Sequence, residues 1–147
     1  MPTYLVDTNV LVYLYDAKRP EKRLRAEQAL NTLKQYRTAC LSAQSLAEFA
    51  SVALRKLDPP LTPTQVFEQV SLLAETWPVL PLTSQIILEA TRGVRDHRLA
   101  YYDAQIWASA RLNQIPIILS EDFQDGQTLE GVRFVNPFTE DFLVAEL

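Results

Sequence analysis

Five acidic residues stand at places in the sequence where a folded protein could use them for chemistry: Asp7, Glu48, Asp103, Asp122 and Asp125. Asp7 and Asp122 follow short apolar runs of strand type. Asp103 opens a predicted helix that is apolar nearly all round. In open α/β sheets, ligands collect beyond the carboxyl ends of the strands, so acids at such places would share one crevice. Ionised carboxylates about 6 Å apart repel one another by roughly 2–3 kcal/mol per pair at an effective dielectric near 20, and a cation would offset that repulsion.

The type of these side chains indicates which cation they would hold. A set of oxygen ligands without His or Cys suits Mg²⁺, or Mn²⁺ in its place, rather than zinc. Such ions bind substrate phosphates, orient a water molecule and offset charge on the leaving oxygen, so the expected chemistry is phosphodiester hydrolysis. Each acid alone also has a purely structural interpretation. The three aspartates at element ends could be helix N-caps, and Glu48 could pair with Arg55.

Several other kinds of site are excluded by the composition. The chain has 3 glycines, which leaves no phosphate-binding loop and no dinucleotide-binding fingerprint. Asp7-Thr8-Asn9 lacks the second aspartate of a phosphoaspartate hydrolase. His97 is the only histidine, so a ribonuclease with paired histidines is excluded, and the charged residues around it indicate a solvated helix end. Cys40 is the only cysteine, which rules out an internal disulfide and is typical of a small buried hydrophobe.

Length and charge predict the class of protein. The chain of 147 residues suits one domain over residues 1–147, and no apolar stretch reaches the length of a membrane span. The first residues also lack the basic region and cleavage site of a secretion signal, so we expect a cytoplasmic protein. The net charge of −4 argues against a strongly basic nucleic-acid binder. Without the five candidate acids, however, 13 acids stand against 14 bases.

The elements that must position these acids follow from apolar periodicity and from turn residues. Strands are predicted at residues 4–6, 38–41, 79–80, 115–119 and 132–135. Helices are predicted at residues 10–15, 21–36, 43–57, 63–76, 84–96 and 103–113. Thr62-Pro63-Thr64-Gln65 is a capping-box pattern at a helix start. Strands that alternate with helices predict an α/β fold, with a mostly parallel sheet of four or five strands between two helical layers.

Taken in order, the motifs resemble a known family over the whole chain. They are Leu5-Val6-Asp7-Thr8-Asn9, Glu48, Tyr101-Tyr102-Asp103-Ala104, Leu119-Ser120-Glu121-Asp122-Phe123 and Val135-Asn136-Pro137-Phe138. Together they resemble a PIN domain, and within that family the VapC-type toxins of bacterial toxin–antitoxin pairs. The resemblance implies the PIN fold in one domain, and an Mg²⁺-dependent or Mn²⁺-dependent endoribonuclease.

The resemblance also implies roles for single residues. It assigns the metal-site carboxylates to Asp7, Glu48, Asp103 and Asp122, and it makes Ser120 a residue that orients the site. Asp125 matches a position that is often acidic but less regular, so its role as a ligand stays open. As partners the family implies an RNA substrate, a small antitoxin that blocks the site, and a second copy in a homodimer.

Two sets of basic residues are candidates for contact with RNA phosphates. One set follows the first helix and the other precedes Asp103; they are Lys18, Arg19, Lys22, Arg23 and Arg25, and Arg92, Arg95 and Arg98. Tyr101 or Tyr102 could stack on an unpaired base. The alternative for both sets is a solvated helix face.

Two other functions also stay open: a PIN-like binding module without turnover, and a housekeeping PIN nuclease. The presence of all four acids favours an enzyme.

Overall fold

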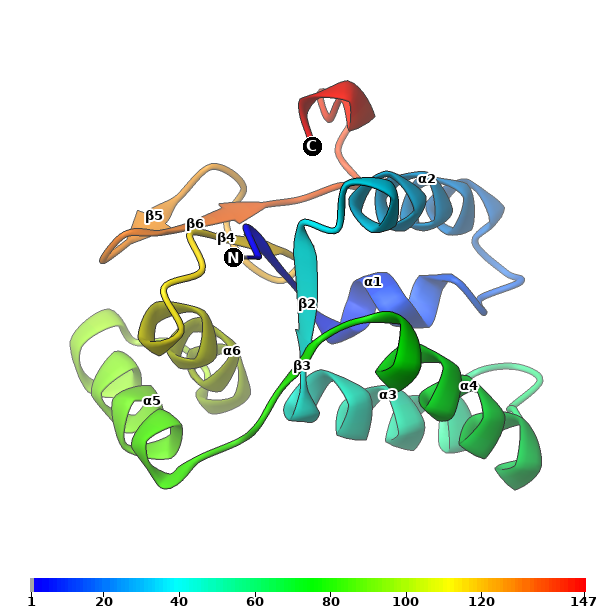
Figure 1. Cartoon of the computed structure of the whole chain (residues 1–147), viewed down its shortest axis with the longest axis horizontal. Coiled ribbons are helices and arrows are strands. Elements are labelled where there is room, and N and C mark those ends of the chain that lie inside the picture. Colours follow the sequence, from blue (N-terminus) through cyan, green and yellow to red (C-terminus); the bar gives the residue numbers. More distant parts are fainter. Residues whose placement is uncertain (1) are drawn as a thin grey trace.

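The computed structural model describes residues 2–147 and contains one six-stranded sheet (Figure 1). Its strands are β1 (Tyr4–Val6), β2 (Ala39–Ser42), β3 (Val79–Leu80), β4 (Ile117–Leu119), β5 (Thr128–Leu129) and β6 (Val132–Val135). Their order across the sheet is β3-β2-β1-β4-β6-β5, and every pair is parallel except β5 with β6.

The expectation of four or five strands omitted β5. This strand has two residues and pairs with β6 through a tight hairpin in which Glu130 and Gly131 have φ values of 46° and 84°. Glycine tolerates such left-handed geometry. A strand of two residues is too short to show a period-two pattern, so the sequence does not reveal it.

The helices form two layers, one on each side of the sheet (Figure 1). They are α1 (Thr8–Tyr13), α2 (Pro20–Tyr36), α3 (Ala43–Arg55), α4 (Pro63–Thr76), α5 (Ser84–His97) and α6 (Tyr101–Leu112), with a short 3-10 turn at Val144–Glu146. Residues of α1 to α4 share one hydrophobic cluster with Tyr4 and Val6, whereas those of α5 and α6 share a second cluster with Leu5. The alternating side chains of β1 therefore face opposite layers. The predicted three-layer α/β/α fold is confirmed.

Two helix starts differ from the predicted ones. Helix α1 begins at Thr8 rather than Val10, because Asp7 caps it and accepts a hydrogen bond from the Thr8 N–H at 2.7 Å. Helix α6 begins at Tyr101, with Ala100 at its N-cap, so Asp103 lies inside the first turn and does not open the helix. Apolar periodicity marks the face of a helix better than its first residue, which depends on the cap.

Other local signals are confirmed. The capping box of α4 is present, with Thr62 and Gln65 each accepting a hydrogen bond from the other's backbone N–H. Ser42 caps α3 as predicted. In the other helical layer, α5 and α6 pack against each other so closely that a Cβ added at Gly93 would lie 2.8 Å from the ring of the buried Trp107. None of the helices within residues 2–147 is long and apolar enough to cross a membrane.

Candidate functional site

The candidate site lies where the order of the strands reverses. Central strand β1 is flanked by β2, which follows it in the chain, and by β4, which the chain reaches much later. At the carboxyl ends of the strands, the Asp7 N–H donates to the Leu119 carbonyl at 3.0 Å and the Ser120 N–H donates to Val135 at 2.9 Å. Such a topological switch point is where open α/β sheets bind ligands.

Asp7 is almost fully buried, with 3% of its surface exposed. Besides the capping bond from Thr8, its other carboxylate oxygen accepts a hydrogen bond from the Ser120 hydroxyl at 2.8 Å. That hydroxyl oxygen in turn accepts bonds from the Asn9 side chain at 3.0 Å and from the Asp122 backbone at 3.1 Å. Ser120 and Asn9 thus hold Asp7 in one orientation. Asp7 is both a helix cap and a member of the candidate site.

Burial is the main reason why the pKa of Asp7 is raised to about 7, because it penalises the charged form. The hydrogen bonds from Ser120 and Thr8 lower this pKa, and the negative charges of Asp122 and Glu48 raise it further. A carboxyl group with a pKa near neutral pH, at the switch point of the sheet, is a candidate functional group with a stated physical cause.

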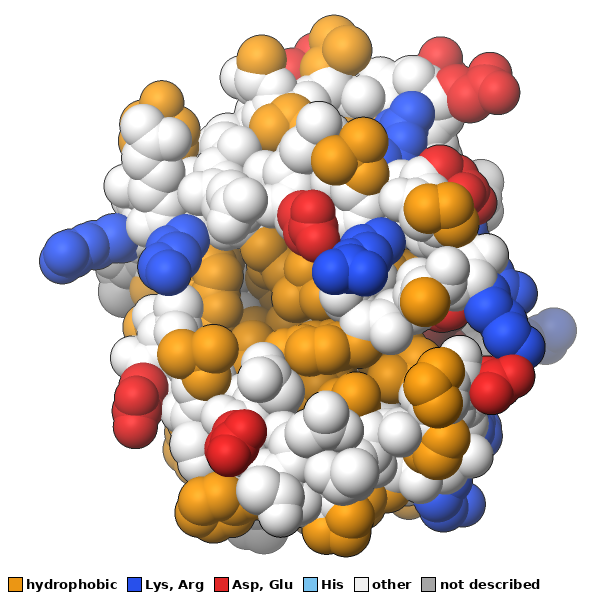
Figure 2. All heavy atoms as spheres, turned by 90° about the vertical axis from the view of Figure 1, so that its right-hand side faces the viewer, with side chains coloured by type: hydrophobic (Ala, Val, Ile, Leu, Met, Phe, Trp, Pro, Cys, Tyr) orange, Lys and Arg blue, Asp and Glu red, His pale blue; other side chains and the backbone are white. Residues whose placement is uncertain are grey.

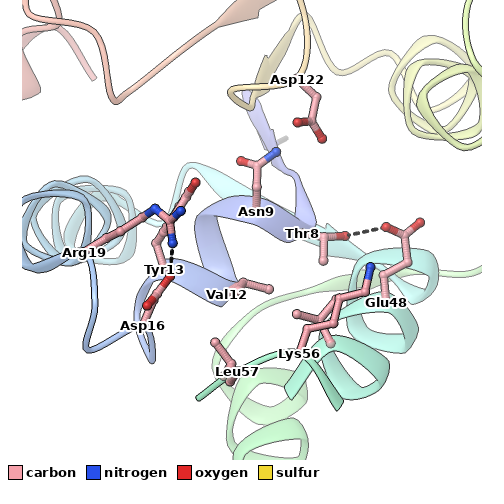
Figure 3. Close-up of a pocket in the computed structure, with 11 residues that line it drawn as sticks. Thr8, Asn9, Val12, Tyr13, Asp16, Arg19, Glu48, Lys56, Leu57 and Asp122 are labelled. Atoms are coloured by element: carbon pink, nitrogen blue, oxygen red, sulfur yellow. Dashed lines mark hydrogen bonds and ion pairs between the residues drawn. The ribbon is translucent and has the colours of Figure 1, made fainter. Parts of the chain in front are cut away.

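Glu48 extends from α3 and is held by two side chains. It accepts hydrogen bonds from the Thr8 hydroxyl at 3.2 Å and from Gln44 at 2.7 Å, as Figure 3 shows for Thr8. Gln44 also donates to the Tyr102 carbonyl at 3.0 Å, which ties α3 to the start of α6. The expected alternative, a pair with Arg55, is wrong, because that guanidinium donates to Ser51 instead.

Asp103 and Asp122 are the other two acids of the candidate site. Burial raises the pKa of Asp103, followed by the charges of Asp122 and Glu48, the same two acids that act on Asp7. The capping interpretation is wrong for both residues, since Ala100 caps α6 and Asp122 precedes irregular chain and then β5. Asp125 is different: it accepts a hydrogen bond from the Asn136 N–H at 2.9 Å, and it is not among the charges that raise the pKa of Asp7 or Asp103.

The donor set suits a hard cation held partly through water. Within residues 2–147, no three Asp, Glu, His or Cys side chains lie close enough together to form a ready-made metal cage. The charges of Asp122 and Glu48 nevertheless raise the pKa of both Asp7 and Asp103, so a cation near these acids would offset that repulsion. Mg²⁺ binds through one or two carboxylates and keeps several waters, so a loose group of carboxylates fits it better than it fits zinc.

Two of these acids, Glu48 and Asp122, line a cavity of about 370 Å³ (Figure 3). Its walls come from α1, α3, the loop after each of them, and the segment after β4: Thr8, Asn9, Val12, Tyr13, Asp16, Arg19, Glu48, Val52, Lys56, Leu57 and Asp122. Sequence reasoning did not single out Thr8, Asn9 or Lys56. Thr8 and Asn9 directly follow Asp7, and this position could have marked them as candidates. No pattern in the sequence marks Lys56.

The structure pairs most of the candidate RNA-binding cations internally. In the first set, Lys22 binds Glu121 at 2.9 Å, and Lys18, Arg23 and Arg25 also contact acids or carbonyls. Arg19 pairs with Asp16 at 3.3 Å and also lines the cavity. In the second set, Arg92 and Arg95 form ion pairs around α5. His97 ends α5, as expected, but its side chain is only 24% exposed, because its ring packs edge-on against Trp107 and contacts a carboxylate oxygen of Glu130 at 2.6 Å.

A three-layer α/β/α domain with acids gathered at its switch point defines a class that includes metal-dependent nucleases. The PIN domain profile matches residues 4–124, so the chain belongs to the PIN domain family. The expected family is thereby confirmed.

Solved structures share this fold. A toxin–antitoxin complex from Klebsiella pneumoniae matches with a TM-score of 0.67 and 21% identity, over 91% of this chain and 97% of that one. DNA-bound VapBC from Salmonella typhimurium matches with a TM-score of 0.63 and 20% identity, over 91% of this chain and 97% of that one. VapC20 from Mycobacterium tuberculosis, a toxin that cleaves the sarcin–ricin loop, matches with a TM-score of 0.56 and 15% identity, over 78% of this chain and 86% of that one. No curated protein matches the sequence significantly.

Proposed function

We propose that this PIN domain protein is a metal-dependent endoribonuclease that hydrolyses RNA phosphodiester bonds, and that it acts as the toxin of a type II toxin–antitoxin pair. The observation that carries the proposal is the buried Asp7, whose pKa is raised to about 7 beside Asp122 and Glu48 at the switch point. A purely structural cap does not need two further acids next to it. The resemblance to toxin structures supports the same function.

In this proposal the carboxylates of Asp7, Glu48, Asp103 and Asp122 hold Mg²⁺, or Mn²⁺ in its place, with Asp125 as a further candidate. Bound there, the ion would supply a polarised phosphate and an activated water. Ser120 and Asn9 fix the orientation of Asp7, and Thr8 and Gln44 fix that of Glu48. These hydrogen bonds set the carboxylates before substrate arrives, so little reorganisation is needed at the reaction step.

Mapping the ends of total RNA after brief expression in a bacterial host tests the activity. We expect new ends at defined sites from the wild-type protein and none from Asp7→Asn. A protein that binds RNA in Mg²⁺ without producing such ends would instead favour a binding module without turnover. Cleavage that a co-expressed small neighbouring protein does not suppress would favour a housekeeping nuclease.

The proposed partners are a small antitoxin and a second copy of the chain, with a cytoplasmic location for the complex. A hollow lined mainly by hydrophobic side chains lies on the face that carries α2 and α4 (Figure 2). A groove of about 240 Å³ runs between these helices, with Leu30, Leu72 and Leu73 among its lining residues. An apolar groove of this kind suits an amphipathic peptide segment. Light scattering of the purified chain tests the homodimer.

A further inference from the structure

The cavity beside the acids has cations on two of its walls. Glu48 and Val52 of α3 and Lys56, the C-cap residue of that helix, follow one another at intervals of four residues and all line the cavity. Residues with this spacing share one face of a helix. Lys56 therefore stands roughly 12 Å along the helix axis from Glu48. In Figure 3 its side chain extends back toward the Glu48 carboxylate.

Arg19 approaches the same cavity from the opposite wall, just before α2 (Figure 3). Its side chain is 54% exposed, and its one ion pair, with Asp16, spans 3.3 Å between neighbours in sequence. Lys56 takes part in none of the ion pairs found between residues 2 and 147. Within the described residues Lys56 is thus free of ion pairs, and Arg19 would exchange its single pair with Asp16 for a ligand from solution. By contrast, Lys22 is occupied by Glu121.

The chemistry of the cavity matches a nucleic-acid strand. Val12, Val52 and Leu57 also line it and offer an apolar surface for a ribose or a base. A phosphodiester strand that approaches four carboxylates meets strong repulsion, which nearby cations reduce. An ammonium and a guanidinium on opposite walls suit a backbone that passes between them, since both groups bind phosphate oxygens.

We propose that this cavity is the binding site for the single-stranded RNA segment next to the cleaved bond, with Lys56 and Arg19 each contacting a backbone phosphate. The assignment rests on the proposed ribonuclease function. It replaces Arg92, Arg95 and Arg98 as the phosphate contacts, because none of these three lines the cavity. Lys56 and Arg19 are binding residues in this assignment and leave the acids to the chemistry.

The test measures binding of an unstructured single-stranded RNA oligonucleotide to the Asp103→Asn protein in Mg²⁺ at several salt concentrations. Lys56→Gln and Arg19→Gln should each weaken binding by about three- to tenfold and reduce the salt slope by about 0.7, the value for one lost phosphate contact. Lys56→Arg should keep the slope. The matched control is Lys34→Gln, an exposed lysine in the last turn of α2 that lies outside this cavity, and it should change nothing.

A second readout uses the protein with Asp103 intact. Lys56→Gln should raise KM for RNA and leave kcat nearly unchanged, because it removes binding and not chemistry. If wild type cleaves RNA but both glutamine variants keep its salt slope, the cavity assignment is overturned and the nuclease function stands. A fall in kcat with an unchanged slope also overturns it, since Lys56 would then act on Glu48. If the wild-type protein neither binds nor cleaves RNA, both proposals fail.

Discussion

Two clusters of charged side chains in this protein are built in contrary ways. At the switch point, acids gather without bases: no ion pair within residues 2–147 involves Asp7, Glu48, Asp103 or Asp122. On α5, α6 and the β5–β6 turn, acids and bases alternate instead. There Arg92 contacts Glu89, Asp96 and Glu130, and Arg111 contacts Glu89 and Glu130.

The pKa values follow the same division. The pKa of Glu130 is lowered to about 2, first by the hydrogen bond from Arg92 and then by the one from His97, whereas the pKa of Asp7 is raised to about 7. Paired charges support the fold around Trp107, over whose ring Arg92 lies at 5.5 Å. Unpaired acids oppose folding, and such a cost is expected where a ligand later supplies the missing charge.

The largest expected effect is on catalysis. Asp103→Asn keeps the shape of the side chain and removes one negative charge from the unpaired cluster, so cleavage of RNA in Mg²⁺ should fall at least ~10²-fold. The control takes a carboxylate from the paired cluster: Glu130→Gln should leave the cleavage rate unchanged and lower the melting temperature. Full activity of Asp103→Asn would remove the functional difference between the clusters.

The next effect concerns the packing beneath the paired cluster. In Gly93→Ala the new methyl group would meet the buried Trp107 ring at 2.8 Å. Overpacking of this kind costs about 1–3 kcal/mol, and the better helix propensity of alanine offsets about 1 kcal/mol. We expect a net loss of stability in urea unfolding, with RNA cleavage retained below the transition. A more stable Gly93→Ala would show that the two helices can separate at no cost.

Metal ions should distinguish the two clusters in thermal melts. A ligand bound only by the native state adds about 1.4 kcal/mol of stability at ten times its Kd. Mn²⁺ or Mg²⁺ should therefore raise the melting temperature of the wild-type protein, and Asp7→Asn should gain much less. In EDTA, Asp7→Asn should melt no lower than wild type, because it relieves repulsion and asparagine also caps α1 well. Equal metal-induced shifts in both proteins would count against Asp7 as a ligand.

The smallest effect is the pH dependence of the metal-free protein. The pKa of Asp7 is about 7 in the folded state, against about 3.9 in an unfolded chain. The folded state therefore binds more protons between these values, and its stability declines as the pH rises through about 7. In EDTA, the melting temperature of wild type should fall relative to Asp7→Asn from about pH 5 to about pH 8. The paired acids titrate below this range, so a constant difference would refute the raised pKa.

The sequence alone predicted the layers of the fold and the residues proposed for the candidate site. Runs such as Tyr4–Val6, the capping box at Thr62 and the periodicity of the helices depend on neighbours in the chain, so local patterns predict them. The acids could be singled out because each stands near the end of a predicted strand or the start of a predicted helix. That placement survives even where the exact helix start was wrong, as for Asp103 in α6.

The tertiary structure alone decided which charges are paired and which are not. Ser120 reaches Asp7 across 113 positions, and Arg92 reaches Glu130 across 38. Side chains of Lys18, Lys22 and Arg19 look alike in the sequence, yet one meets Asp58, one meets Glu121 and one faces the cavity. A charge takes its energy from the groups within a few ångströms and from its burial, and only the folded chain defines these surroundings.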